Sequence, residues 1–110
     1  MASNGTAAAG RVNGTPRQER RRERRKPVMW AARLETAAGA VACVAFDLSL
    51  GGAKLRLDET VALHHPAQLV LEHHGVIAAE PVWQEGGVLG LRFTVPAAYV
   101  RAVLGDALKL

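Results

Sequence analysis

Two short segments of the sequence carry side chains suited to binding an anionic ligand. The first is an arginine-rich run, residues 19–27 (ERRRERRKP), and the second is a turn-like segment, residues 47–52 (DLSLGG). A guanidinium group presents a rigid fork of donors that can bind phosphate bidentately, and its flat face stacks on aromatic rings. Asp47 has a carboxylate, which only accepts hydrogen bonds when ionised, so it suits a ligand group that offers donors.

The positive charge of the chain is concentrated at its N-terminus. The formal net charge is +4, but residues 1–27 carry eight Lys or Arg against two Glu (+6), and residues 28–110 carry six against eight Asp or Glu (−2). A basic arm on a mildly acidic body indicates an anionic partner, of which phosphate is the commonest kind.

Other chemistry finds little support in the sequence. Cys43 is the one cysteine and lies in an apolar run, which predicts a buried core residue rather than a disulfide or a thiolate metal site. The His64-His65 and His73-His74 pairs would point to opposite faces of a strand, so no metal site is expected. No catalytic constellation is found, and the chain is predicted not to be an enzyme.

Alternating apolar residues predict the elements that position these segments. Six strands are expected, at residues 28–36, 40–46, 53–57, 67–73, 76–84 and 88–94. The third alternates strictly and should point Lys54 and Arg56 outward. The second is apolar throughout, which favours a strand buried on both faces. Pro81 predicts an edge or a bulge because proline cannot donate to a ladder, and Pro96 suits the first turn of a helix that ends at Leu110.

These elements predict a mainly all-β fold, a six-stranded antiparallel β-barrel with a C-terminal α-helix. At 110 residues the chain has room for one domain. We expect a disordered N-terminal tail at residues 1–18, followed by a domain at 19–110. Within that domain lie the arginine arm (19–27), the barrel (28–95) and the helix (96–110).

The two segments, in this order and in this strand context, resemble the signature of the PilZ domain family, an RxxxR arm followed by a D/NxSxxG turn. Asp47, Ser49 and Gly52 take the three named positions of the turn. Arg21 and Arg25 are assigned to the arm because Lys26-Pro27-Val28 supplies the strand entry that follows the family's second arginine. Other frames, such as Arg20 with Arg24, also satisfy the spacing.

The resemblance implies a PilZ-type barrel that binds cyclic di-GMP and needs no cofactor. Arg20, Arg21 and Arg25 would clamp the phosphates and guanine. Asp47 complements the N1–H and N2–H2 donors of guanine and disfavours adenine.

Three further residues receive expected roles in that site. Ser49 would donate to a phosphate or carbonyl and help Asp47 to read the guanine edge. Gly52 would shape the turn through a positive φ and a close backbone approach. Trp83 either stacks on a base, as an aromatic residue does in some relatives, or packs on the barrel.

The resemblance also implies a signalling role. Such a receptor would relay the ligand signal to an effector protein, which the sequence does not identify, in the control of motility, exopolysaccharide production or biofilm. The N-terminus lacks the apolar core of a signal peptide and no stretch approaches membrane-spanning length, so a bacterial cytoplasmic location without membrane insertion is expected.

Two other functions fit parts of the sequence. A small barrel could bind nucleic acid through its basic arm, but the acidic body and the lack of an aromatic stacking face disfavour this interpretation. A PilZ-like adaptor could bind protein instead of nucleotide, but the intact motifs disfavour it.

Overall fold

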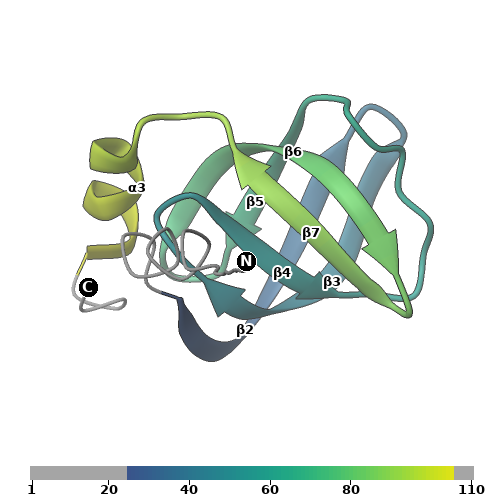
Figure 1. Ribbon diagram of the computed structural model, residues 1–110, viewed down its shortest axis with the longest axis horizontal. Coiled ribbons are helices and arrows are strands. Elements are labelled where there is room, and N and C mark those ends of the chain that lie inside the picture. The colour runs from purple at the N-terminus through teal and green to yellow at the C-terminus, as the bar shows by residue number, and fades with distance from the viewer. Residues whose placement is uncertain (1–24, 106–110) are drawn as a thin grey trace, which may run out of the picture.

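Six strands close into an antiparallel barrel in the computed structural model, which describes residues 25–105 (Figure 1). The strands are β2 (Lys26–Thr36), β3 (Gly39–Leu48), β4 (Gly52–Arg56), β5 (Ala67–Leu71), β6 (Gly75–Glu85) and β7 (Val88–Phe93). Their order around the barrel is β2-β3-β4-β7-β6-β5, and β5 pairs with β2 to close it. The predicted six-stranded barrel is therefore confirmed.

The barrel interior is filled by aliphatic side chains from every strand. Leu34, Leu55, Leu69, Ile77 and Leu89 are fully buried, at 0% exposure. They alternate with outward residues, as a pleated strand with one buried face requires. Lys54 is half-buried and Arg56 is exposed, which confirms the predicted orientation of the third strand.

The prediction that residues 40–46 form a strand buried on both faces is wrong. Val41, Cys43 and Ala45 point into the barrel, whereas Ala42 is exposed and Val44 is half-buried on the outer surface. A closed barrel of single strands gives each strand one inner and one outer face. The apolar composition of β3 therefore continues onto the barrel exterior.

Tight turns and one proline explain where the strands bend. The β6–β7 hairpin turns at Gly86 and Gly87, whose φ angles of 60° and 79° are the left-handed conformation that two-residue hairpins favour. The ladder between β6 and β7 is irregular between Pro81 and Trp83, which confirms the bulge predicted from the proline.

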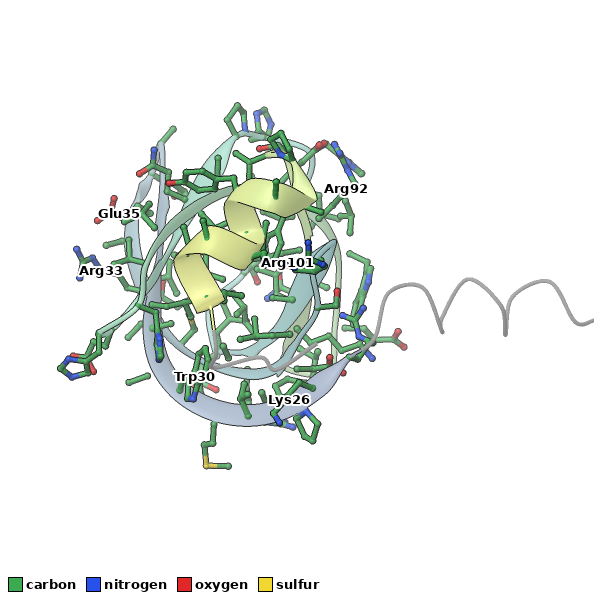
Figure 2. The ribbon with its side chains drawn as sticks, turned by 90° about the vertical axis from the view of Figure 1, so that its left-hand side faces the viewer. Lys26, Trp30, Arg33, Glu35, Arg92 and Arg101 are labelled. Atoms are coloured by element: carbon green, nitrogen blue, oxygen red, sulfur yellow. The ribbon has the colours of Figure 1, made fainter. Side chains whose placement is uncertain are left out.

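The C-terminal helix α3 (Ala97–Leu104) lies across one end of the barrel (Figure 2). Val100 and Leu104 are buried, and Val103 faces Gly75 at the start of β6.

The helix is shorter than the one predicted, because Gly105 has a φ of 52° that departs from helical geometry. Residues 106–110 of the predicted helix lie outside the described residues. Within residues 25–105, α3 falls well short of the length a membrane-spanning helix needs.

Candidate functional site

The outward position of Asp47 depends on a bulge in β3. Strict alternation from the buried Val41, Cys43 and Ala45 would place residue 47 inside the barrel. The ladder between β3 and β4 shifts, however, between the Ala45↔Leu55 pair and the Asp47↔Lys54 pair. The extra residue, Phe46, lets Asp47 follow it on the outer surface, and Leu48 returns to the core. A bulge re-aims a side chain in this way, and here it exposes a carboxylate next to the turn.

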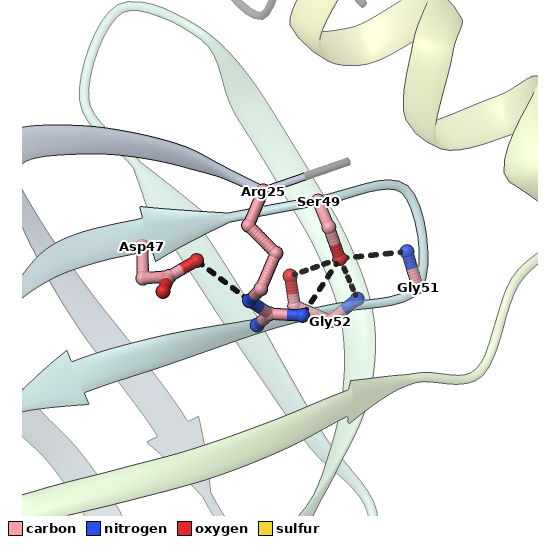
Figure 3. Close-up of polar contacts among 5 residues, drawn as sticks. All are labelled: Arg25, Asp47, Ser49, Gly51 and Gly52. Carbon is pink, nitrogen blue, oxygen red and sulfur yellow. Dashed lines mark hydrogen bonds and ion pairs between the residues drawn. The ribbon is translucent and has the colours of Figure 1, made fainter. Parts of the chain in front are cut away.

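Arg25 connects the end of the arm to this carboxylate. Its Nε donates to Asp47 Oδ1 at 2.8 Å, and its Nη1 donates to Ser49 Oγ at 3.3 Å (Figure 3). The Arg25 and Asp47 side chains keep 35% and 22% of their surface exposed. Because β2 pairs with β3 through Pro27↔Asp47, the strand entry brings Arg25 to the turn. The predicted arm and turn thus meet in the folded chain.

Ser49 is fully buried and organises the turn. Its Oγ accepts hydrogen bonds from the backbone N–H groups of Gly51 and Gly52, both at 3.2 Å, and donates to the Gly52 carbonyl at 3.3 Å (Figure 3). These contacts satisfy backbone groups that a tight turn leaves unpaired. The hydroxyl hydrogen is therefore engaged inside the turn, and the predicted contact between Ser49 and a ligand stays a prediction.

Gly52 is required because a neighbouring strand leaves no room for a side chain, and not because of a positive φ. Its φ is not positive, so that part of the prediction is wrong. A Cβ built on Gly52 would instead collide with the backbone carbonyl oxygen of Leu91 on β7. The close approach in the structure is to the β7 backbone, and it is what excludes a side chain here. A close approach of a ligand to Gly52 stays a prediction.

Trp83 owes its outward position to the bulge in β6. Pro81 is buried and pairs with Leu91, and the shift after it leaves Val82 as the extra residue before the Trp83↔Gly90 pair. The indole lies over the α-carbon of Gly90, where a Cβ would collide with the ring, and it keeps 41% of its surface exposed. Trp83 therefore packs on the barrel and also presents a ring surface to solvent.

One row of directly paired residues across the strands joins Asp47 to Trp83. Asp47 on β3 pairs with Lys54 on β4, Lys54 pairs with Gly90 on β7, and Gly90 pairs with Trp83 on β6. Directly paired residues share a face of the sheet, so all four lie on the outer surface. The three steps of about 4.8 Å each place the Asp47 and Trp83 backbones about 14 Å apart along that surface. Sequence reasoning placed Lys54 outside but did not connect it to the site, because the row depends on strand order.

The remaining arginine predictions lie outside the described residues. These are Arg20 and Arg21, so Arg25 is the one of the three assigned arm arginines whose position can be stated.

Burial affects the chemistry of Cys43. Its side chain points into the barrel, and desolvation raises the pKa of the thiol to about 11. The thiol therefore stays protonated at neutral pH, as a core residue would.

Three hollows elsewhere on the described surface are lined by carboxylates. One over β2, β5 and β6 is lined by Glu35 and Glu80, a second by Asp58 and Glu85, and a third by Glu59. No Lys or Arg lines any of the three, so they suit an anionic ligand poorly.

Comparison with known proteins supports a shared fold. The chain is similar to the crystal structure of the PilZ domain of CeSA from a cellulose-synthesizing bacterium, with a TM-score of 0.59 and 22% identity over 76% of this chain and 97% of that one. It is also similar to YcgR from Escherichia coli, crystallised in complex with c-di-GMP, with a TM-score of 0.61 and 21% identity over 82% of this chain and 45% of that one. Curated protein sequences yield no match. The family model for the PilZ domain matches residues 19–109, most of the chain including both predicted motifs, and the chain therefore belongs to the PilZ domain family.

Proposed function

We propose that this chain is a non-enzymatic receptor for cyclic di-GMP. The observation that carries the proposal is the direct contact of Arg25 with both Asp47 and Ser49, which brings the two motifs into one site on the barrel surface. Family membership and the c-di-GMP complex of the structural neighbour YcgR support the choice of ligand. The ligand is bound as a signal and not as a cofactor.

Asp47 is the group that selects guanine in this proposal. Its Oδ1 accepts from Arg25, and no described residue donates to its Oδ2. The carboxylate can therefore accept from the N1–H and N2–H2 donors of a guanine while Arg25 holds its orientation. Adenine presents an acceptor at N1 and would leave a lone pair facing the carboxylate, which is unfavourable.

The arginine arm supplies positive charge beside a body, residues 28–110, whose formal net charge is −2. Arg25 fixes the end of the arm at the turn, and Arg20 and Arg21 would close over the phosphates and the purine rings of the bound nucleotide. Ordering about five backbone residues of the arm costs on the order of 5–10 kcal/mol, so the net affinity is expected to be moderate despite the charged contacts.

Trp83 would contribute a stacking surface at the other end of the row. Its exposed indole faces solvent, and a base stacked on an aromatic ring gains about 1–3 kcal/mol. Asp47 and Trp83 would then recognise different parts of one ligand.

The ligand-bound arm would signal to an effector protein in the bacterial cytoplasm. An arm that is free in one state and clamped in the other is a two-state element that a partner can read. Motility, exopolysaccharide production and biofilm control are the processes in which we expect this receptor to act.

Isothermal titration of the purified chain with cyclic di-GMP tests the proposal. Cyclic di-AMP, GMP and a short oligonucleotide serve as controls. Saturable binding of cyclic di-GMP alone is expected, and its stoichiometry gives the number of nucleotides bound per chain. Binding of the oligonucleotide alone would replace the proposal with the nucleic-acid function, and no binding of any ligand would favour the protein adaptor.

A further inference from the structure

Lys54 occupies the position between the two recognition groups of the proposed site. It pairs with Asp47 on β3 and with Gly90 on β7. The Trp83 indole lies over Gly90. Lys54 is half-buried, and a lysine with this burial can pack its methylene stem on the barrel while its ammonium group stays in solvent.

Two of the positions next to Lys54 on the outer face are glycines. Gly52 precedes it on the same outer face of β4, and Gly90 follows it across the ladder to β7. Both glycines are buried, Gly52 against the Leu91 carbonyl and Gly90 under the Trp83 indole, so neither sets a side chain of its own beside Lys54.

The charge on Lys54 is not neutralised within residues 25–105. Although Asp47 is its cross-strand partner, the Asp47 carboxylate pairs with Arg25, and no described acidic group lies within 4.0 Å of the Lys54 ammonium. A cation held beside a carboxylate that is already paired remains available to an anion.

We infer that Lys54 binds a phosphodiester group of the nucleotide whose guanine is read by Asp47. This inference rests on the proposed function and adds a binding residue that belongs to neither the arginine arm nor the turn motif. A ligand that reaches from Asp47 toward Trp83 must cross about 10–14 Å of this surface, and its sugar–phosphate ring then lies over Lys54. An ammonium group is a point charge with rotatable donors, which suits a phosphate better than a planar base edge.

Arg56 provides a matched control for this residue. It is the next outward position on β4, it carries the same charge, and its guanidinium lies 4.9 Å from the ring centroid of Phe46. It pairs with Val44 and Val88 and so lies on a different cross-strand row from Asp47 and Trp83.

The test compares the cyclic di-GMP affinity of Lys54→Met, Lys54→Arg and Arg56→Met with that of the unmodified chain. Methionine keeps the apolar stem of Lys54 and removes its charge, so the fold should be retained, which circular dichroism checks. We expect Lys54→Met to weaken binding about tenfold, in line with one charge-assisted contact. Lys54→Arg should stay within about threefold of the unmodified chain because the charge is kept, and Arg56→Met within about twofold because its row is different.

The salt dependence identifies the group that Lys54 contacts. At about 1 M ionic strength the Debye length falls to about 3 Å, so the difference between Lys54→Met and the unmodified chain should shrink markedly if the contact is with a phosphodiester. A difference that is independent of salt would overturn the phosphodiester contact. Equal affinities of Lys54→Met and the unmodified chain would overturn the inference while leaving the proposed function in place. Failure of the unmodified chain itself to bind cyclic di-GMP would instead remove the proposed function, and the inference with it.

Discussion

The two ends of the outer row show two ways of holding a recognition group on a barrel. Asp47 and Trp83 both point outward because a bulge shifts the alternation of their strands. Asp47 is then held by polar contacts, through Arg25 and the turn that Ser49 organises. Trp83 is held by packing, with its ring over Gly90.

This difference separates binding from stability. The Arg25–Asp47 ion pair is partly exposed, and an ion pair of this kind contributes about 0–1 kcal/mol to folding. Changes at the Asp47 end should therefore act mainly on ligand affinity. The glycines that let backbone or ring approach closely should act mainly on the free energy of unfolding, to an extent that depends on whether the atom they accommodate can move.

Replacing Asp47 should have the largest effect on binding. Asp47→Ala removes the acceptor for the guanine donors and leaves Arg25 without its carboxylate partner. One or two lost charge-assisted hydrogen bonds of about 1.5–3 kcal/mol correspond to an affinity lower by about tenfold to 100-fold. Isothermal titration with cyclic di-GMP measures this loss, and thermal unfolding should change little.

Asp47→Asn tests whether the charge of the carboxylate, and not only its size, is needed for binding. The amide has nearly the same size, but it carries no charge and can turn a donor toward the donors of guanine. A comparable loss of affinity is expected. Full affinity in both variants would remove Asp47 from the site.

Replacing Gly52 should have the largest effect on stability. In Gly52→Ala the new methyl group meets the carbonyl oxygen of Leu91, and this atom belongs to the β7 backbone, which cannot move without disturbing the barrel. We expect the free energy of unfolding to fall by about 1–3 kcal/mol. Thermal unfolding followed by circular dichroism should show a midpoint lower by about 4–8 °C per kcal/mol. An unchanged midpoint would mean that the turn relaxes away from β7.

Replacing Arg25 tests whether the fork of donors is needed or only the charge. Arg25→Lys keeps the charge but cannot bridge Asp47 and Ser49 as the guanidinium does. We expect both Arg25→Lys and Arg25→Ala to weaken cyclic di-GMP binding by about tenfold, measured by titration.

Arg33→Ala is the control for the arginine variants. Arg33 lies on β2, the strand that begins after Arg25. It is exposed and forms an ion pair with Glu35 at 2.9 Å, away from the Asp47 end. Its removal should leave the affinity unchanged. An equal loss in Arg33→Ala would point to a general effect of charge and not to the contact between the arm and the turn.

Periodicity in the sequence was enough to predict the barrel but not the path of its outer surface. Alternating leucines such as Leu55, Leu89 and Leu91 located their strands, because burial on one face imposes a period of two. Alternation fails where a bulge adds a residue. Pro81 predicted the bulge in β6, whereas nothing in the composition around Phe46 marks the bulge in β3. The motif residues could be named from their order and spacing. The row through Lys54 could not, since it depends on β4 lying between β3 and β7.

Replacing Gly90 should change the free energy of unfolding less than replacing Gly52. It tests most directly the comparison between the Asp47 and Trp83 ends of the row. In Gly90→Ala the new methyl group meets the indole of Trp83, a side chain that can rotate toward solvent, whereas in Gly52→Ala it meets backbone. We expect a loss of less than about 1 kcal/mol in the free energy of unfolding, because a half-exposed ring gives up little buried area when it moves.

The movement of the ring can be followed by fluorescence. The chain has two tryptophans, so Trp30→Phe first leaves Trp83 as the single reporter. Gly90→Ala in that background should shift the emission of Trp83 to longer wavelength as the ring becomes more exposed, and should weaken cyclic di-GMP binding by about threefold if stacking is partly lost. If Gly90→Ala destabilises the chain as strongly as Gly52→Ala, then Trp83 is fixed as firmly as the backbone. The packed end of the row would in that case be as rigid as the polar end, and Trp83 would be a structural residue of the barrel and not an adjustable surface for a base.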